Sequence, residues 1–255
     1  MKVKVDPTYA DQIWKLTIDS PPGNILDMEM IKGLREQVHL ARQEKDLKAV
    51  VLAGAGKNFS YGASIEEHEK TKVARFLQEF HGLFLDLMEL ETPIMAVVQG
   101  HCLGGGLELA AFSSWIFASD TSDFGLPEIK LGVFPPIASL LLPEKIGQTQ
   151  AESLILTGRT IRAQEAQTMG LISCCVSAEK LENAVRSFIE EEIEPKSSVA
   201  LRYSYRAVRT QLYKTLQYNI SVLEGRYLND LMNTKDANEG IAAFLEKRPP
   251  AWKHR

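Results

Sequence analysis

The sequence predicts an α/β protein with a helical C-terminal part, and three observations support this. Short apolar runs of strand type alternate with amphipathic stretches of helical spacing in the first half of the chain. This alternation is typical of an α/β domain whose strands pair mostly in parallel. After about Ser139 the strand-like runs nearly vanish and helical patterns follow. We therefore expect an α/β core over residues 1–195 and a helical region over residues 196–255.

The predicted strands are short apolar runs with turn residues at their ends. Trp14, Leu16 and Ile18 alternate with polar residues, and the turn SPPGN follows them. Buried strands are predicted for LKAVVLAG and PIMAVVQG, and shorter strands for WIFAS and for a segment near LISCCV. These strands make up the sheet of the predicted core.

The predicted helices are recognised by the spacing of their apolar residues. Asp27 can cap a helix whose apolar face is Ile31, Leu34, Val38 and Ala41. A long second helix is marked by Phe76, Phe80, Leu83, Leu87 and Leu90, and a short one follows the glycines after residue 103. The later helical segments are AESLILTG, AQEAQTMG, AEKLENAVRSFIEEE, VALRYSYRAVRTQLYKTLQYNI and DANEGIAAFLEKR.

Composition narrows the class of protein. A chain of 255 residues with 45% hydrophobic and 24% charged residues has the profile of a globular protein with a sizeable core. A net charge of -4 and a pI near 5.8 argue against a general nucleic-acid binder. Three cysteines do not form a disulfide framework, and no signal peptide or membrane span is recognisable. We expect a cytoplasmic protein without a nucleic-acid or membrane partner.

The segment GHCLGGGLELA places three glycines before a carboxylate, Glu108, in an otherwise apolar run. Bare backbone lets another group approach closely, and a glutamate in apolar surroundings needs a partner. The run is not a dinucleotide-binding motif, because Leu109 stands where a third glycine is required. Gly56 and Lys57 are followed by Asn58, so they do not form a phosphate-binding Walker loop either.

The residues favour an oxyanion site. The N–H of Gly105 would be free at a helix N-terminus, and the turn at Gly62 and Ala63 in FSYGASIEEH can supply a second donor. Glu108, and Glu128 in FGLPEIKLG, could divide acid and base roles beside a carbonyl held as an enolate. The structural alternatives are close helix packing at the glycines and paired core carboxylates.

Five segments, taken in order, resemble motifs of the crotonase (enoyl-CoA hydratase/isomerase) superfamily: FSYGAS, GHCLGGGLELA, FGLPEIKLGVFP, LTGRTIRAQEAQTMGLI and AAFLEKRPPAW. The resemblance extends over most of the chain, from about Trp14 to Trp252. It implies a spiral of β-β-α units with a helical C-terminal trimerisation region. It also implies a homo-oligomer, either a trimer or a dimer of trimers.

The resemblance assigns roles to individual positions. It implies that the N–H groups of Ala63 and Gly105 bind the thioester oxygen, and that Glu108 and Glu128 are the two catalytic glutamates of a hydratase. The substrate is then a CoA thioester, and neither a metal nor a separate cofactor is implied. The further predicted substrate- and CoA-binding residues are Lys57, Ser64, Ile65, Gly104, Pro136, Phe244 and Lys247. Phe244 and Lys247 match residues that reach CoA from a neighbouring subunit in some members.

Two departures bear on the substrate. Straight-chain hydratases usually read G-A-D where this chain has Gly62-Ala63-Ser64, and P-G-A-G-G where it has FPPIAS. The bulkier residues of FPPIAS are expected to reshape the acyl pocket. Both departures resemble the cyclohexa-1,5-diene-1-carbonyl-CoA hydratases of anaerobic benzoyl-CoA degradation, which implies hydration of a cyclic dienoyl-CoA to a hydroxycyclohexene-carbonyl-CoA.

Several alternatives stay open at this point. They are a straight-chain enoyl-CoA hydratase, a double-bond isomerase, and a catalytically silent module that binds a CoA ester or a protein. RNA binding is disfavoured by the acidic pI. His68 can line the acyl pocket or lie in solvent on a helix, and Ser64 can contact substrate or cap that helix.

Overall fold

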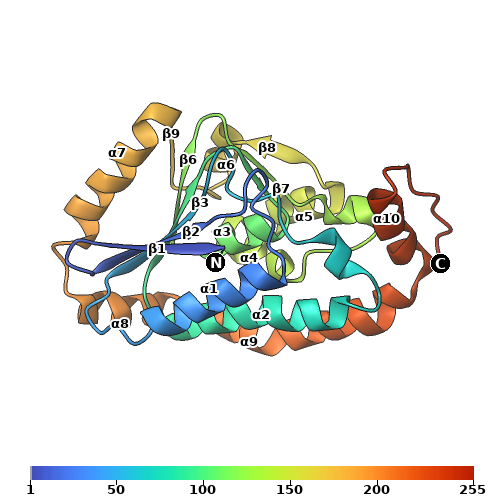
Figure 1. Cartoon of the computed structure of the whole chain (residues 1–255), viewed down its shortest axis with the longest axis horizontal. Coiled ribbons are helices and arrows are strands. Elements are labelled where there is room, and N and C mark those ends of the chain that lie inside the picture. Colours follow the sequence, from blue (N-terminus) through green and yellow to red (C-terminus); the bar gives the residue numbers. More distant parts are fainter. Residues whose placement is uncertain (1) are drawn as a thin grey trace.

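The computed structural model describes residues 2–255 and contains two sheets surrounded by helices (Figure 1). The larger sheet has the order β1-β2-β3-β4-β6-β9, with bounds Val3–Thr8, Ile13–Ile18, Ala49–Gly54, Ile94–Val98, Trp115–Ser119 and Cys174–Val176. β1 and β2 are antiparallel, and the other pairs are parallel. The smaller sheet has the order β5-β7-β8, with bounds His101–Leu103, Asp123–Gly125 and Thr160–Arg162.

The larger sheet is covered on both faces. Val50 and Leu52 of β3 belong to the main apolar core, together with α1 (Met28–Ala41) and α2 (Val73–Leu90). Ala49 and Val51 alternate with them and join a second cluster with α7 (Ala178–Phe188) and the turn η3 (Ile189–Ile193). Burial on both faces explains why the parallel strands are continuous apolar runs.

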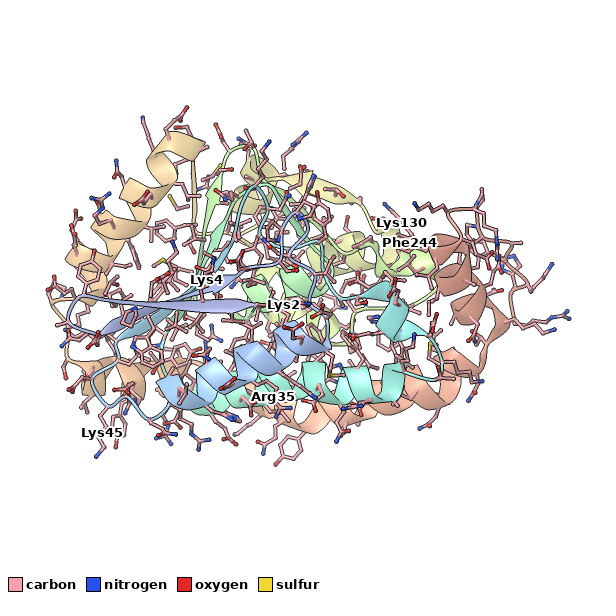
Figure 2. All side chains as sticks on the ribbon, in the orientation of Figure 1. Lys2, Lys4, Arg35, Lys45, Lys130 and Phe244 are labelled. Carbon is pink, nitrogen blue, oxygen red and sulfur yellow. The ribbon has the colours of Figure 1, made fainter. Side chains whose placement is uncertain are left out.

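Side-chain hydrogen bonds begin α1 and connect it to α2. The side chain of Asp27 accepts a hydrogen bond from the Met30 N–H at 2.9 Å, which confirms Asp27 as the cap of α1. Arg35 of α1 donates to Glu79 and to Asp86 of α2, each at 2.6 Å (Figure 2). These contacts hold α2, whose Phe80 packs against the glycine run.

The long helical segment predicted after residue 198 is two helices, α8 (Ser198–Val208) and α9 (Thr210–Gly225), separated at Arg209. α9 lies beside α2 and α4 (Pro136–Ile146) and contributes Leu216 and Ile220 to the main core (Figure 1). The turns η4 (Arg226–Asp230) and η5 (Leu231–Asn233) and the helix α10 (Lys235–Leu245) follow. The boundary between residues 195 and 196 stays a prediction.

Most of the predicted elements are confirmed. The later helices also include α3 (Gly105–Phe112), α5 (Gln148–Thr157) and α6 (Ala163–Thr168). Sequence analysis missed β1, the three short strands of the smaller sheet, and α4, whose run of prolines obscured its helical pattern. Over residues 2–255, no helix combines the length and the apolarity that a membrane crossing requires.

Candidate active site

Two free backbone N–H groups lie side by side at the start of α3. Gly104 is the residue before α3 and has a φ of +51°, which suits glycine. The N–H of Gly105 is the first of the helix and has no partner within it. Ala63 forms a parallel bridge with Leu26, and a Cβ built on Gly105 would lie 3.3 Å from the Ala63 nitrogen. Neither N–H has a hydrogen-bond acceptor among residues 2–255. The pair has the donor arrangement that a negative oxygen requires.

Gly104 and Gly106 are each in close contact with a different part of the site. A Cβ on Gly104 would lie 2.9 Å from Oε1 of Glu128, which therefore rests against the backbone before α3. A Cβ on Gly106 would lie 2.7 Å from Cβ of Ser60, in the loop that continues to Ala63. Close packing and the oxyanion geometry are thus both present in this one segment, so the two interpretations are compatible.

The carboxyl group of Glu108 is hydrogen-bonded to the backbone at the start of α4. Its side chain is 3% exposed, and Oε1 accepts a hydrogen bond from the Ala138 N–H at 2.8 Å. Burial raises the pKa of Glu108 to about 7, while the backbone N–H groups of Ala138 and Ile137 act in the opposite direction. Pro136 at the first position of α4 lacks an N–H and has a backbone angle suited to a helix start.

Glu128 lies in the short helix η2 (Pro127–Leu131), facing the same space. Its Oε2 is buried and has no hydrogen-bond partner within the described chain. Burial and, to a smaller extent, the charge of Glu108 together raise the pKa of Glu128 to about 8. Both carboxyl groups therefore hold a proton more tightly than an ordinary glutamate, and Glu128 more tightly than Glu108, which suits an acid and a base role for the pair.

A cavity of about 50 Å³ lies against Ala63, Gly105 and Glu128, while Glu108 does not line it. Its lining residues are Tyr61, Gly62, Ala63, Ile65, His68, Gly104, Gly105, Pro127, Glu128, Leu131, Val133 and Ile241. This volume is well below the several hundred Å³ that are typical of ligand sites in proteins. The cavity brings the predicted oxyanion donors and one predicted carboxylate into a single space.

His68 belongs to the wall of this cavity and is not a solvated helix residue. Its Nδ1 lies 2.7 Å from the carbonyl oxygen of Ser64, and its ring packs on Phe76 with centroids 4.8 Å apart. Burial lowers its pKa, which keeps the ring neutral. The side chain of Ser64 makes no capping hydrogen bond to η1 (Ile65–His68).

The remaining predicted residues are placed differently. Ile65 and Gly104 line the cavity, as expected for an acyl pocket. Pro136 is buried at the start of α4 and does not line this cavity. Its expected contact with substrate stays a prediction.

The three predicted CoA contacts are exposed. Phe244 lies near the end of α10 (Figure 2). Lys247 follows that helix, and Lys57 follows β3 on the surface. None of the three lines the cavity, but α10 packs against η1 and η2, two elements of its wall. Their roles in binding CoA stay predictions.

Sequence analysis missed the amide donors of Ile137 and Ala138. The prolines in this stretch were interpreted as part of a pocket, although a proline at the first position is a recognised start of a helix. That signal, combined with the apolar run that follows, could have identified α4 and the support it provides to Glu108.

The buried carboxylates should make the protein less stable at high pH. The pKa of Glu128 rises from 4.5 to about 8 in the folded state, so folding favours the protonated form. Its contribution to the free energy of unfolding is complete below pH 4.5 and is lost as the pH rises through 8. Glu128→Gln cannot ionise, and we expect its Tm to exceed the wild-type value by about 4 °C or more at pH 9.

Thermal unfolding followed by circular dichroism at pH 5, 7 and 9 measures this effect. The difference between Glu128→Gln and wild type should shrink towards pH 5, where both side chains are neutral. Glu182→Gln, at an exposed position of α7, serves as the control and should follow the wild-type curve. Parallel curves for Glu128→Gln and wild type at all three pH values would contradict a raised pKa.

Comparisons with known proteins agree with this geometry. The family described as enoyl-CoA hydratase/isomerase matches residues 8–255. The cyclohexa-1,5-dienecarbonyl-CoA hydratase of Thauera aromatica is 40% identical over 241 residues, 94% of this chain and 93% of that protein. Two solved structures are similar over nearly all of both chains. An enoyl-CoA hydratase from Mycobacterium avium subsp. paratuberculosis K-10 has 27% identity and a TM-score of 0.87, with 99% of each chain covered. An enoyl-CoA hydratase from Bacillus anthracis has 30% identity and a TM-score of 0.77, with 100% of each chain covered.

The fold and the site thus define an enzyme of the hydro-lyase class that acts on CoA thioesters, with the crotonase fold. The chain belongs to the enoyl-CoA hydratase/isomerase family. This confirms the resemblance found in the sequence, while trimerisation stays a prediction.

Proposed function

We propose that this enzyme adds water to a cyclic dienoyl-CoA thioester, cyclohexa-1,5-diene-1-carbonyl-CoA, in the anaerobic degradation of benzoyl-CoA. The observation that supports a hydratase best is the buried pair Glu108 and Glu128, whose pKa values are raised by burial, near two free N–H groups. An isomerase needs a single carboxylate to move one proton, whereas hydration uses both a base and an acid.

The first step is activation of the thioester. The N–H groups of Ala63 and Gly105 bind the carbonyl oxygen and stabilise the negative charge that develops on it. Their position at the N-terminus of α3 adds the favourable field of the helix. One such donor typically contributes about 2.7–4 kcal/mol to lowering the barrier.

The two carboxyl groups then divide the proton transfers. Glu108 is the better base, because the N–H groups at the start of α4 stabilise its ionised form. It takes a proton from water while the water oxygen bonds to the ring carbon, and the electron pair of the double bond moves to the thioester oxygen. Glu128 keeps its proton to the higher pH and delivers it to carbon as the enolate collapses. Proton exchange with water resets the pair.

Two observations support the cyclic substrate. The Thauera aromatica relative, named for this substrate, is 40% identical to the chain over nearly its whole length. In addition, the wall behind the cavity is aromatic: His68 packs on Phe76, and Phe80 lies beside Gly105. Flat apolar surfaces of this kind suit a planar ring.

A hydration assay tests the substrate directly. Cyclohexa-1,5-diene-1-carbonyl-CoA and crotonyl-CoA are supplied in parallel, the loss of the double bond is followed by absorbance, and the products are identified by mass. We expect kcat/KM to be at least about a hundredfold higher for the cyclic diene. The reverse preference would indicate a straight-chain hydratase, and binding without turnover of either ester would indicate a silent binding module.

We also propose that the enzyme is a trimer or a dimer of trimers in the cytoplasm. Large apolar side chains are exposed on the C-terminal helices, among them Tyr203 and Val208 on α8 and Tyr218 on α9. Burying such a surface between subunits would be favourable. The cysteines Cys102, Cys174 and Cys175 are free, in keeping with a reducing compartment.

A further inference from the structure

Tyr227 is a buried residue next to the site that neither the oxyanion pair nor the carboxylate pair explains. It lies in η4, directly after α9, and is 1% exposed. Its ring contacts Phe134 at a centroid distance of 5.4 Å and His68 at 6.5 Å. Phe134 lies between η2, which carries Glu128, and α4. Tyr227 is therefore placed against the elements that form the site.

The hydroxyl of Tyr227 has no hydrogen-bond partner in the described part of the chain. A buried hydroxyl without a partner is unfavourable, and a phenylalanine would fill the same space without that cost. The Oε2 atom of Glu128 is also buried and unpartnered. A donor and an acceptor are therefore both unsatisfied in the same region of the protein.

The charge of Glu128 affects the pKa of the Tyr227 hydroxyl. Burial raises the pKa of Tyr227 well above its usual range, and the charges of Glu128 and Glu108 raise it further. The phenol therefore stays protonated and can donate a hydrogen bond at any pH at which the enzyme works. Both carboxylates act on this hydroxyl through their charge, and the ring of Tyr227 lies against His68, which lines the cavity together with Glu128.

The reacting water has a bonding position that fits this hydroxyl. A water molecule that donates its two hydrogens to Glu108 and Glu128 keeps two lone pairs, of which one bonds to the substrate carbon. The second lone pair needs a donor, because Glu108 is ionised and the proton of Glu128 is delivered to the substrate carbon. A neutral phenol is a suitable donor.

We propose that Tyr227 is a third residue of the reaction centre and that its hydroxyl donates a hydrogen bond to the oxygen of the water that is added. This inference rests on the proposed hydratase function. In the reverse direction the same hydrogen bond is made to the hydroxyl group of the hydroxyacyl-CoA product. Tyr227 thereby orients the water for attack and recognises the hydrated ester, while it makes no bond to the dienoyl ester itself.

The variant Tyr227→Phe tests this role, since it retains the ring and removes only the hydroxyl. We expect kcat for hydration to fall about tenfold, the effect of one hydrogen bond, with an unchanged KM for the dienoyl-CoA. In the dehydration direction, KM for the hydroxyacyl-CoA should rise by a similar factor. Tm should stay at or above the wild-type value, because an unsatisfied hydroxyl is removed.

Tyr205→Phe is the matched control. Tyr205 on α8 is also buried, but it lies against Arg209 and Tyr213, and neither carboxylate of the site acts on it. It should retain wild-type kinetics in both directions. Wild-type kinetics for Tyr227→Phe would overturn the inference and leave the hydratase function intact.

The outcome for the wild-type enzyme separates the two proposals. If it hydrates crotonyl-CoA but not the cyclic diene, the proposed substrate fails, and Tyr227→Phe is then compared with wild type on crotonyl-CoA and 3-hydroxybutyryl-CoA. The water site is the same for either substrate, so the expected tenfold loss still applies. If the wild-type enzyme hydrates no CoA ester, both the proposed function and the role of Tyr227 are overturned.

Discussion

Glu108→Gln and Glu128→Gln should each lower kcat for hydration by a factor of about 10² to 10⁴, the usual contribution of a positioned acid or base. Glutamine occupies nearly the same volume but can neither accept the proton from water nor release one to carbon. In Glu108→Gln, the oxygen of the amide can still accept the Ala138 N–H, so the contact with α4 is retained. The rate loss then reports on proton transfer and not on a disrupted fold.

Binding and stability measurements serve as controls for these two variants. Both should bind a non-reactive CoA ester with nearly wild-type affinity in calorimetry, because the oxyanion donors are backbone groups of Ala63 and Gly105. Steady-state assays with the proposed dienoyl-CoA measure kcat. If one variant retained nearly full activity with an intact fold, the two-carboxylate mechanism would fail, and a mechanism with a single carboxylate would take its place.

The fold could be predicted where a local pattern determines an element. β3 is a continuous apolar run because both of its faces are buried, and Asp27 begins α1 because its side chain satisfies a free N–H. The short strands of the smaller sheet have three residues each, too few to show a periodicity. These strands form by pairing with segments that are far away in the sequence, and a local sequence pattern cannot predict such pairing.

The candidate site divides in the same way. The glycine run and Glu108 are adjacent in the sequence, and Glu128 stands between hydrophobic flanks, so these residues could be recognised and the family resemblance gave them catalytic roles. Tyr227 is a single aromatic residue in a helical stretch, about one hundred residues away from both glutamates. Only tertiary packing brings its ring against His68 and Phe134 at the site, and the same applies to the contact of the Ala138 amide with Glu108.

Gly104→Ala should lower kcat about a hundredfold, because it displaces a carboxylate without removing it. The new Cβ would lie 2.9 Å from Oε1 of Glu128, closer than real contacts allow, and the neighbouring backbone cannot yield easily before α3. A displacement of a reacting group by about 1 Å can cost a factor of 10² in rate. Steady-state kinetics with the dienoyl-CoA measures the loss, and KM should rise as well, since Gly104 also lines the cavity.

Gly147→Ala separates this effect from backbone strain. Gly147, between α4 and α5, also has a positive φ, of +78°, but a Cβ there would meet no atom within 4 Å. Both substitutions force alanine into a backbone region that suits glycine, and each should cost about 1–3 kcal/mol of stability. Since only Gly104 has a carboxylate oxygen against its α-carbon, only Gly104→Ala should lose activity at a temperature where both variants are folded. Equal kcat values for the two variants would show that the position of Glu128 against Gly104 does not control the rate.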